Sequence, residues 1–282
     1  MSSKSIAKEQ IIPIILAIAT FSGLIVVLYF TILILNLLPT SEKIFLGLRK
    51  RDFVVGFTIY LKTAIDFAIF MGNLMHKNLG WKKRIAIEFG TALGNGLGTF
   101  FILIVWVFFK EVPILMALMI ILASLLLLQM AEESVGMFLK KNNLTHISTP
   151  ALFLQKQLNL INKISGKLFK SVIPNLNVLD IKSLSFLNLI MFSFTIPFIL
   201  GLDNFAGYIP LFSIVNVYGF IIGVFVGHML LNIGLFIFPK RTVDVIKNPV
   251  VILLGGIVFI FIALFGFYEA VKILKPLLFN LL

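Results

Sequence analysis

The sequence contains no cysteine and only three histidines among its 282 residues. The absence of cysteine excludes a disulfide framework, a thiolate metal site and a redox-active dithiol. Charged residues make up 13% of the chain, whereas soluble domains carry about 25%. The chain also lacks a nucleophile–base pair, a Walker loop and a zinc-ligand spacing, so we expect neither an enzyme nor a bound cofactor.

What the sequence has in excess is hydrophobic residues, which form 60% of it and give a mean hydropathy of +1.08. A helix needs about 20 apolar residues to cross a hydrocarbon core about 30 Å thick. The segments that are long enough, or nearly so, are Ile11–Leu38, Phe53–Met75, Ile85–Phe109, Val112–Met130, Leu184–Leu200, Ser213–Phe238 and Val250–Leu274. The sequence therefore predicts an all-α polytopic membrane protein with about seven transmembrane helices.

The basic residues, which give a net charge of +12, lie mostly in the connections between apolar segments. Aromatic residues are scarce there, so membrane orientation explains the charge better than a nucleic-acid partner. The N-terminus and the second, fourth and sixth connections hold 16 Lys and Arg residues, and the remaining connections hold 7. This bias predicts a cytoplasmic N-terminus. Because no cleavage motif follows Ile11–Leu38, we expect this segment to be a retained helix.

The longest polar stretch, residues 140–183, has leucine and isoleucine at helical spacing between Ala151 and Val172. This pattern predicts an amphipathic helix lying at the cytoplasmic membrane interface. Its lysines would face anionic lipids of the bilayer.

Two blocks of the chain contain the same features in the same order, which indicates an internal repeat. Each block has an acid in apolar surroundings, three glycines at four-residue spacing, a lysine and a further apolar segment. The acids are Asp66 and Asp203, and the glycines are Gly90, Gly94 and Gly98 in one block and Gly219, Gly223 and Gly227 in the other. Close helix packing explains the glycines, but it does not explain two acids at matched depth.

Each repeat has three spans, so consecutive repeats must be inserted in opposite directions, an architecture typical of transporters. The predicted layout is an extra N-terminal helix and loop (1–52), a first repeat (53–139), the basic linker (140–183) and a second repeat (184–282). The two inverted three-helix repeats would place a site near the middle of the membrane.

The segment 201–212, GLDNFAGYIPLF, directly follows an apolar run. A carboxylate at bilayer depth costs at least a few kcal/mol and normally faces a protein interior, a cavity or an ion path. The glycines and Pro210 predict a broken helix around Asp203 and Asn204, with freed carbonyls lining a cavity. We therefore expect these two residues on a cation path.

The pattern G-x-D-N-x-x-x-Y-x-P-L-F in 201–212 resembles the second-repeat motif of the cadmium-resistance transporters, a branch of the lysine-exporter superfamily. Ala64-Ile65-Asp66 resembles the first-repeat motif of that family, although the family usually has two consecutive acids and here Phe67 follows Asp66. The resemblance covers about 53–133 and 184–274. It implies export of a divalent cation across a prokaryotic cell membrane, with H⁺ as the candidate exchanged ion.

The residues themselves suggest how a metal could be held. Asp66 and Asp203 would offer carboxylate oxygens from the two halves, and Asn73 and Asn204 would add amide oxygens. An all-oxygen shell suits Mn²⁺, Ca²⁺ or Mg²⁺ better than Cd²⁺, which favours thiolate.

Other candidate residues on the path each have two explanations. Lys62, one helical turn before Asp66, either neutralises it structurally or takes part in proton movement. His228 is a proton carrier, a nitrogen ligand or a hydrogen-bonding residue between helices, with Asn232 as its candidate partner.

Tyr208 belongs either to a gate or to an interfacial aromatic belt, and the belt is the simpler explanation. Glu88, near Lys82 and Arg84 in the sequence, is expected to pair at the surface.

A non-transporting subunit of a membrane complex would explain several of the same residues. In such a protein, Lys62, Asp66 and Asp203 would lock helices together or brace a partner. A homo-oligomer is compatible with either function, and an organic or anionic substrate attracted by Lys62 is a further alternative.

Overall fold

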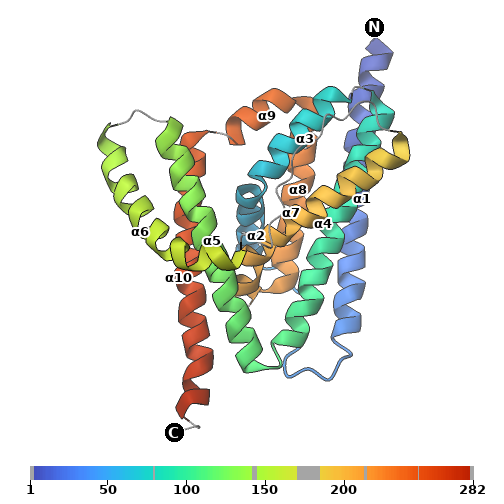
Figure 1. Cartoon of the computed structure of the whole chain (residues 1–282). Helices are drawn as coiled ribbons and strands as arrows, with labels where there is room; N and C mark the ends of the chain where they lie inside the picture. The colour runs from blue at the N-terminus through green and yellow to red at the C-terminus, as the bar shows by residue number, and fades with distance from the viewer. Residues whose placement is uncertain are drawn as a thin grey trace. The chain divides into compact units, whose positions relative to one another are not determined.

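A computed structural model of the chain describes residues 3–78, 80–141, 145–169, 185–212, 215–246 and 248–279. Over these residues the fold is helical without any β-strand (Figure 1). The helices are α1 (Ser3–Leu35), α2 (Lys50–Thr63), α3 (Ile65–Lys77), α4 (Trp81–Phe109), α5 (Pro113–Lys141), α6 (Thr145–Phe169), α7 (Phe186–Phe212), α8 (Val217–Ile237), α9 (Pro239–Ile246) and α10 (Pro249–Phe279).

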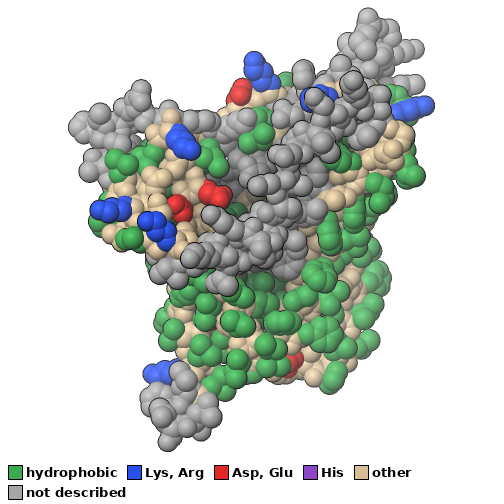
Figure 2. Space-filling view, in the orientation of Figure 1, with side chains coloured by type: hydrophobic (Ala, Val, Ile, Leu, Met, Phe, Trp, Pro, Cys, Tyr) green, Lys and Arg blue, Asp and Glu red, His purple; other side chains and the backbone are tan. Residues whose placement is uncertain are grey.

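Five of the described helices, α1, α4, α5, α8 and α10, are long and apolar enough to cross a membrane. Their outer sides expose large apolar residues, for example Phe30 on α1 and Phe261 on α10. Figure 2 shows such hydrophobic side chains gathered over the long helices on the face that it draws. The predicted all-helical, polytopic membrane fold is confirmed at this level, and the number of seven spans remains a prediction.

The predicted span Phe53–Met75 is wrong as a single helix, because it divides into α2 and α3 at Ala64. Ala64 has φ −83° and ψ 12°, outside the α-helical range. With 14 and 13 residues, the two helices are each about 20 Å long. Neither crosses a 30 Å hydrocarbon core alone.

The predicted helix break around Asp203 is also wrong, because α7 runs without interruption through this segment to Phe212. A glycine inside a helix costs only about 1 kcal/mol relative to alanine, which an otherwise apolar helix can tolerate. Pro210 lies in the last turn of α7, where the loss of one backbone hydrogen bond does not end the helix early.

The chain forms two compact units. The first comprises Met1–Glu111, Ser183–Phe205 and Phe212–Ile246, and the second comprises Val112–Lys182, Ala206–Leu211 and Lys247–Leu282. The first unit thus contains α1–α4, most of α7, α8 and α9, and the second contains α5, α6 and α10.

Glycines let the helices of the first unit approach backbone to backbone. A Cβ atom on Gly223 of α8 would lie 2.1 Å from the carbonyl oxygen of Phe53 on α2. A Cβ on Gly94 of α4 would lie 2.3 Å from the carbonyl oxygen of Phe194 on α7. Real side chains do not fit at such distances, so the predicted packing role is confirmed for Gly94 and Gly223. A Cβ on Gly98 or Gly219 would meet no atom closer than 3.9 or 3.5 Å, so these two glycines are not required by close packing.

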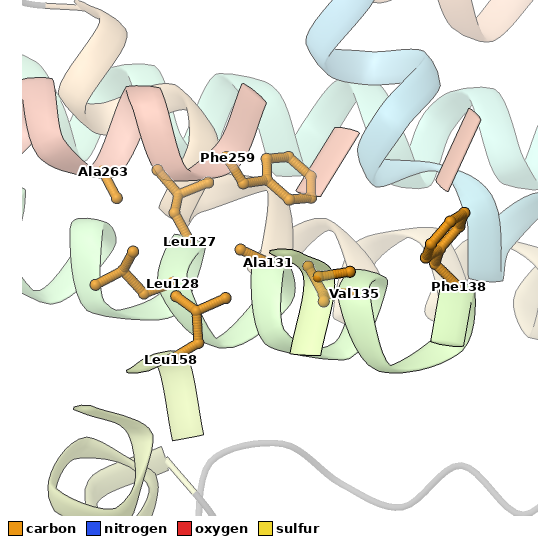
Figure 3. Packing of buried hydrophobic residues seen from close by; sticks show 9 residues of the cluster. Leu127, Leu128, Ala131, Val135, Phe138, Leu158, Phe259 and Ala263 are labelled. Atoms are coloured by element: carbon orange, nitrogen blue, oxygen red, sulfur yellow. The ribbon is translucent and has the colours of Figure 1, made fainter. Parts of the chain in front are cut away.

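The second unit is built on the contact between α5 and α10, and α6 packs against α5, with Leu158 beside Leu128 (Figure 3). The buried cluster consists of Leu127, Leu128, Ala131, Val135, Phe138, Ala151, Leu158, Phe259 and Ala263. The predicted amphipathic helix exists as α6, but Leu158 and Ala151 pack into this cluster instead of facing lipid. Contact with α5 removes them from water as effectively as a membrane surface would. Leu152, Phe153 and Leu160 remain exposed on α6. Residues 170–183 of the predicted linker, including the end of its helix, lie outside the described residues.

Candidate functional site

His228 is a buried ring on α8 in the first unit. The residue before the helix, Asn216, caps it: its side-chain oxygen accepts a hydrogen bond from the Gly219 amide at 2.9 Å. The glycines that follow bring α8 against α2, so that Tyr60 of α2 reaches the imidazole: its hydroxyl lies 2.6 Å from His228 Nδ1. Tyr60, rather than the expected Asn232, is therefore the hydrogen-bonding partner of His228.

Three aromatic rings from three helices surround the imidazole. The ring centroids of Phe21 on α1, Tyr60 on α2 and Phe67 on α3 lie 4.9, 5.3 and 5.0 Å from that of His228. The imidazole is therefore enclosed by aromatic rings from α1, α2 and α3.

One helical turn beyond His228, the side chain of Asn232 is fully buried. Neither amide atom of Asn232, nor His228 Nε2, has a hydrogen-bond partner among the described residues. A buried polar group left in this state costs about 1–3 kcal/mol, and such groups in native proteins usually mark a water, an ion or a functional role. The two side chains thus offer one ring nitrogen and one amide to a polar ligand.

The same ring contacts both sides of the interrupted helix, because Tyr60 precedes the break at Ala64 and Phe67 follows it. Asp66 is the second residue of α3, in the turn whose amide groups lack carbonyl partners within their own helix. Such a helix start is a favourable place for a negative charge.

The structure places the remaining predicted path residues only by their helices. Lys62 belongs to α2, Asp66 and Asn73 to α3, and Asp203 and Asn204 to α7, and their side chains lie outside the described residues. The proposed meeting of Asp66 with Asp203 therefore remains a prediction.

Tyr208, also on α7, is described and is fully buried. A ring without exposed surface does not face the membrane interface, so the belt explanation for Tyr208 is wrong. The alternative, that Tyr208 belongs to a gate, stays a prediction.

Glu88 on α4 was expected at the surface, but its side chain is fully buried. Neither carboxyl oxygen has a hydrogen-bond partner in the described part of the chain. A signal in the sequence could have revealed this position, because Glu88, Thr91, Asn95 and Thr99 follow one another at spacings of three or four residues. They share one face of the helix, and all four are buried.

No three His, Asp or Glu side chains of the described residues lie close enough together to hold a metal ion.

Comparison of the chain with family models, with curated proteins and with solved structures gives no match. The resemblance of the segments 64–66 and 201–212 to the cadmium-resistance transporters thus remains a prediction from those motifs.

Proposed function

We propose that the protein is a membrane transporter that exports a divalent cation through a site between two inverted three-helix repeats. One observation supports this best: His228 packs against both sides of the helix break that precedes Asp66, and it and Asn232, one turn further on, are buried with unfilled hydrogen-bonding capacity. A protein that only needed stability would gain from a continuous helix and an apolar pair at these positions.

Interrupted helices at membrane depth are tolerated where protein or a water-filled cavity surrounds the freed backbone groups. Transporters use such interruptions to coordinate ions with carbonyls and to direct helix ends at substrates. In our proposal, Asp66 and Asp203 provide the negative charge for the cation, and Asn73 and Asn204 add neutral oxygens. Lys62, one turn before Asp66, would balance the charge of the empty site.

Reciprocal packing supports the two repeats. Glycines of α4, in the proposed first repeat, pack on α7, the first helix of the second repeat. Glycines of α8, in the second repeat, pack on α2, the first helix of the first repeat. The third long helices of the two repeats, α5 and α10, pack on each other. A two-fold relation between repeats requires contacts that are exchanged in this way.

The proposed oxygen donors favour Mn²⁺, Ca²⁺ or Mg²⁺, whereas the resemblance implies Cd²⁺. Flux of these four ions into proteoliposomes, followed with a metal-sensitive dye, will establish whether the protein transports any of them. We expect flux of at least one ion through the wild-type protein.

The decisive variant is Asp203→Asn, which removes the charge and keeps the size of the side chain. We expect it to abolish flux, because an amide cannot neutralise a dication in a low-dielectric site. Asp244→Asn provides the matched control, since Asp244 is exposed on α9. Wild-type flux in Asp203→Asn would refute the proposed site. No flux of any ion through the wild type, together with stable co-purification of other membrane proteins, would instead favour a non-transporting subunit.

A further inference from the structure

We propose that Glu88 binds the proton that is exchanged for the exported cation, an inference that rests on the proposed function. In this proposal the exchanged proton binds to a residue on α4, whereas the acids Asp66 and Asp203 of the two repeats bind the cation.

The first argument is burial without a partner. The Glu88 side chain has no exposed surface, and neither of its oxygens has a hydrogen-bond partner among the described residues. It lies about two helical turns after Trp81, inside an apolar helix long enough to cross the membrane. An ionised carboxylate in such a place costs far more than a neutral acid. In the conformation described here, Glu88 therefore holds a proton.

The second argument is the scarcity of charge around it. The elements packed against α4 are α1, α8 and α7. The described side chains of α1, from residue 11 onward, include no acid or base other than the exposed Tyr29. On α8 the ionisable groups are His228 and Tyr218, and on α7 they are Asp203 and Tyr208.

Its own helix carries Lys82, Lys83 and Arg84 in the two turns before Glu88. Arg84 lies one turn earlier on the same face, and its Nε is buried without a hydrogen-bond partner. No ion pair joins the two side chains in this structure. The pair thus has two arrangements: a neutral Glu88 apart from Arg84, as described here, and an ionised Glu88 that accepts hydrogen bonds from the guanidinium.

The proton step is simple to balance. When α4 gives water access to Glu88 from one side, the carboxyl O–H bond breaks, the proton passes to water and the electron pair stays on the carboxylate. Arg84 then stabilises the negative charge, and a proton taken up from the opposite side restores the neutral acid. Each cycle carries one proton through Glu88, against the direction of the cation.

The test uses full-length protein in proteoliposomes with a pH dye inside. Glu88→Gln mimics a carboxyl that never loses its proton. We expect this variant to keep cation-for-cation exchange across the membrane and to lose both proton-driven net export and cation-driven proton movement. Glu133→Gln, an exposed acid on α5, serves as the matched control and should behave as the wild type. If Glu88→Gln does not fold, Glu88→Met, of similar volume, replaces it.

Coupled proton movement at the wild-type level in Glu88→Gln would overturn the proposal. Loss of exchange together with coupling, in a protein that melts normally, would also overturn it, because Glu88 would then belong to the cation path itself.

A second measurement does not depend on transport. If the folded protein holds the Glu88 proton while the unfolded chain releases it, wild-type stability falls with rising pH relative to Glu88→Gln. The difference in melting temperature between the two should therefore widen as the pH rises above the pKa of glutamate in an unfolded chain, about 4.3. If the wild type moves no cation, the proposed function fails, and this difference alone decides the proton site: widening supports proton binding, and a constant difference refutes it.

Discussion

The two compact units bury their polar groups in different ways. In the second unit, the hydroxyls of Ser124 and Ser134 donate to carbonyls one turn earlier in α5, each at 2.8 Å. In the first unit, Glu88, His228 and Asn232 keep buried atoms without partners in the described part of the chain. Among the described side chains of α5, α6 and α10, Gln129 Oε1 is buried without a partner, and the two serine hydrogen bonds are typical of a structural support. The first unit carries the polar groups whose cost stability alone does not explain.

The largest effect on stability is expected in the core of the second unit. Phe259 of α10 is only 2% exposed and packs against Leu127 and Ala131 of α5 (Figure 3). Phe259→Ala would leave a cavity and should cost about 3–5 kcal/mol, measured as a fall in melting temperature. Cation flux per folded molecule should be unchanged if this unit is only a support. Phe261→Ala on the same helix, where the ring is 69% exposed, is the control and should change stability little.

The next largest effect on stability is expected where glycines bring two helices together, and it should differ between the two units. A Cβ on Gly223 would meet the backbone of α2 at 2.1 Å, whereas one on Gly256 of α10 would lie 3.0 Å from Ser134 Cβ. Gly223→Ala should therefore destabilise the protein by about 1–3 kcal/mol or more, and Gly256→Ala by less. Gly23→Ala on α1, with no atom within 4 Å, should be neutral or slightly stabilising. Equal melting temperatures for the first two variants would contradict the different closeness of the two contacts.

A smaller effect is expected at the polar cluster of the first unit. Tyr60→Phe removes the hydroxyl that lies 2.6 Å from His228 Nδ1, which leaves a second ring nitrogen unpaired and should cost about 1–3 kcal/mol. Cation flux should fall as well, because the imidazole loses its fixed orientation. Tyr29→Phe, on the exposed side of α1, should change neither quantity. Normal flux in Tyr60→Phe would separate His228 from the cation path.

The smallest effect concerns a polar contact outside the membrane spans. The backbone amide of Ser41 donates to Glu111 at 3.0 Å, and this bond holds the pKa of Glu111 below its usual value of 4.5. The Ser41 hydroxyl and the charges of Lys110 and Lys43 lower the same pKa further, against an opposing effect of burial.

A carboxyl with a lowered pKa stabilises the folded state above its unfolded pKa, and this contribution is lost as the pH falls through the folded pKa. Wild type should therefore melt slightly above Glu111→Gln at neutral pH, and the difference should vanish on acidification below pH 4.5. A difference that persists in acid would contradict the assigned contact.

Several helices could be located from the sequence because their apolar runs end where polar residues begin. The predicted segments Ile85–Phe109 and Ser213–Phe238 correspond closely to α4 and α8. The predicted end of the fourth segment at Met130 was too early, since α5 continues to Lys141. Ala131, Val135 and Phe138 pack into the buried cluster on one face of α5. A search for continuous apolar runs weighs all faces of a helix together, so it misses apolar residues that are confined to one face.

The position of the helix break could not be predicted from local composition. Glycine and proline favoured a break in 201–212, yet α7 is continuous and the break lies at Ala64, which is not a helix breaker. The two halves of the interrupted segment have different partners: Gly56 of α2 lies against Phe220 of α8, and Gly72 of α3 lies against Val243 of α9. These contacts join residues more than 150 positions apart, which no local pattern records.

The sequence by itself determined that this is a helical membrane protein, since its apolar residues form continuous runs of about 20, which satisfy their backbone groups as helices. It also identified His228 and the glycine helices. Only the tertiary structure decided that Tyr60 contacts His228 and that Glu88 is buried. Both depend on which helix faces lie together, and that is fixed by packing between distant segments.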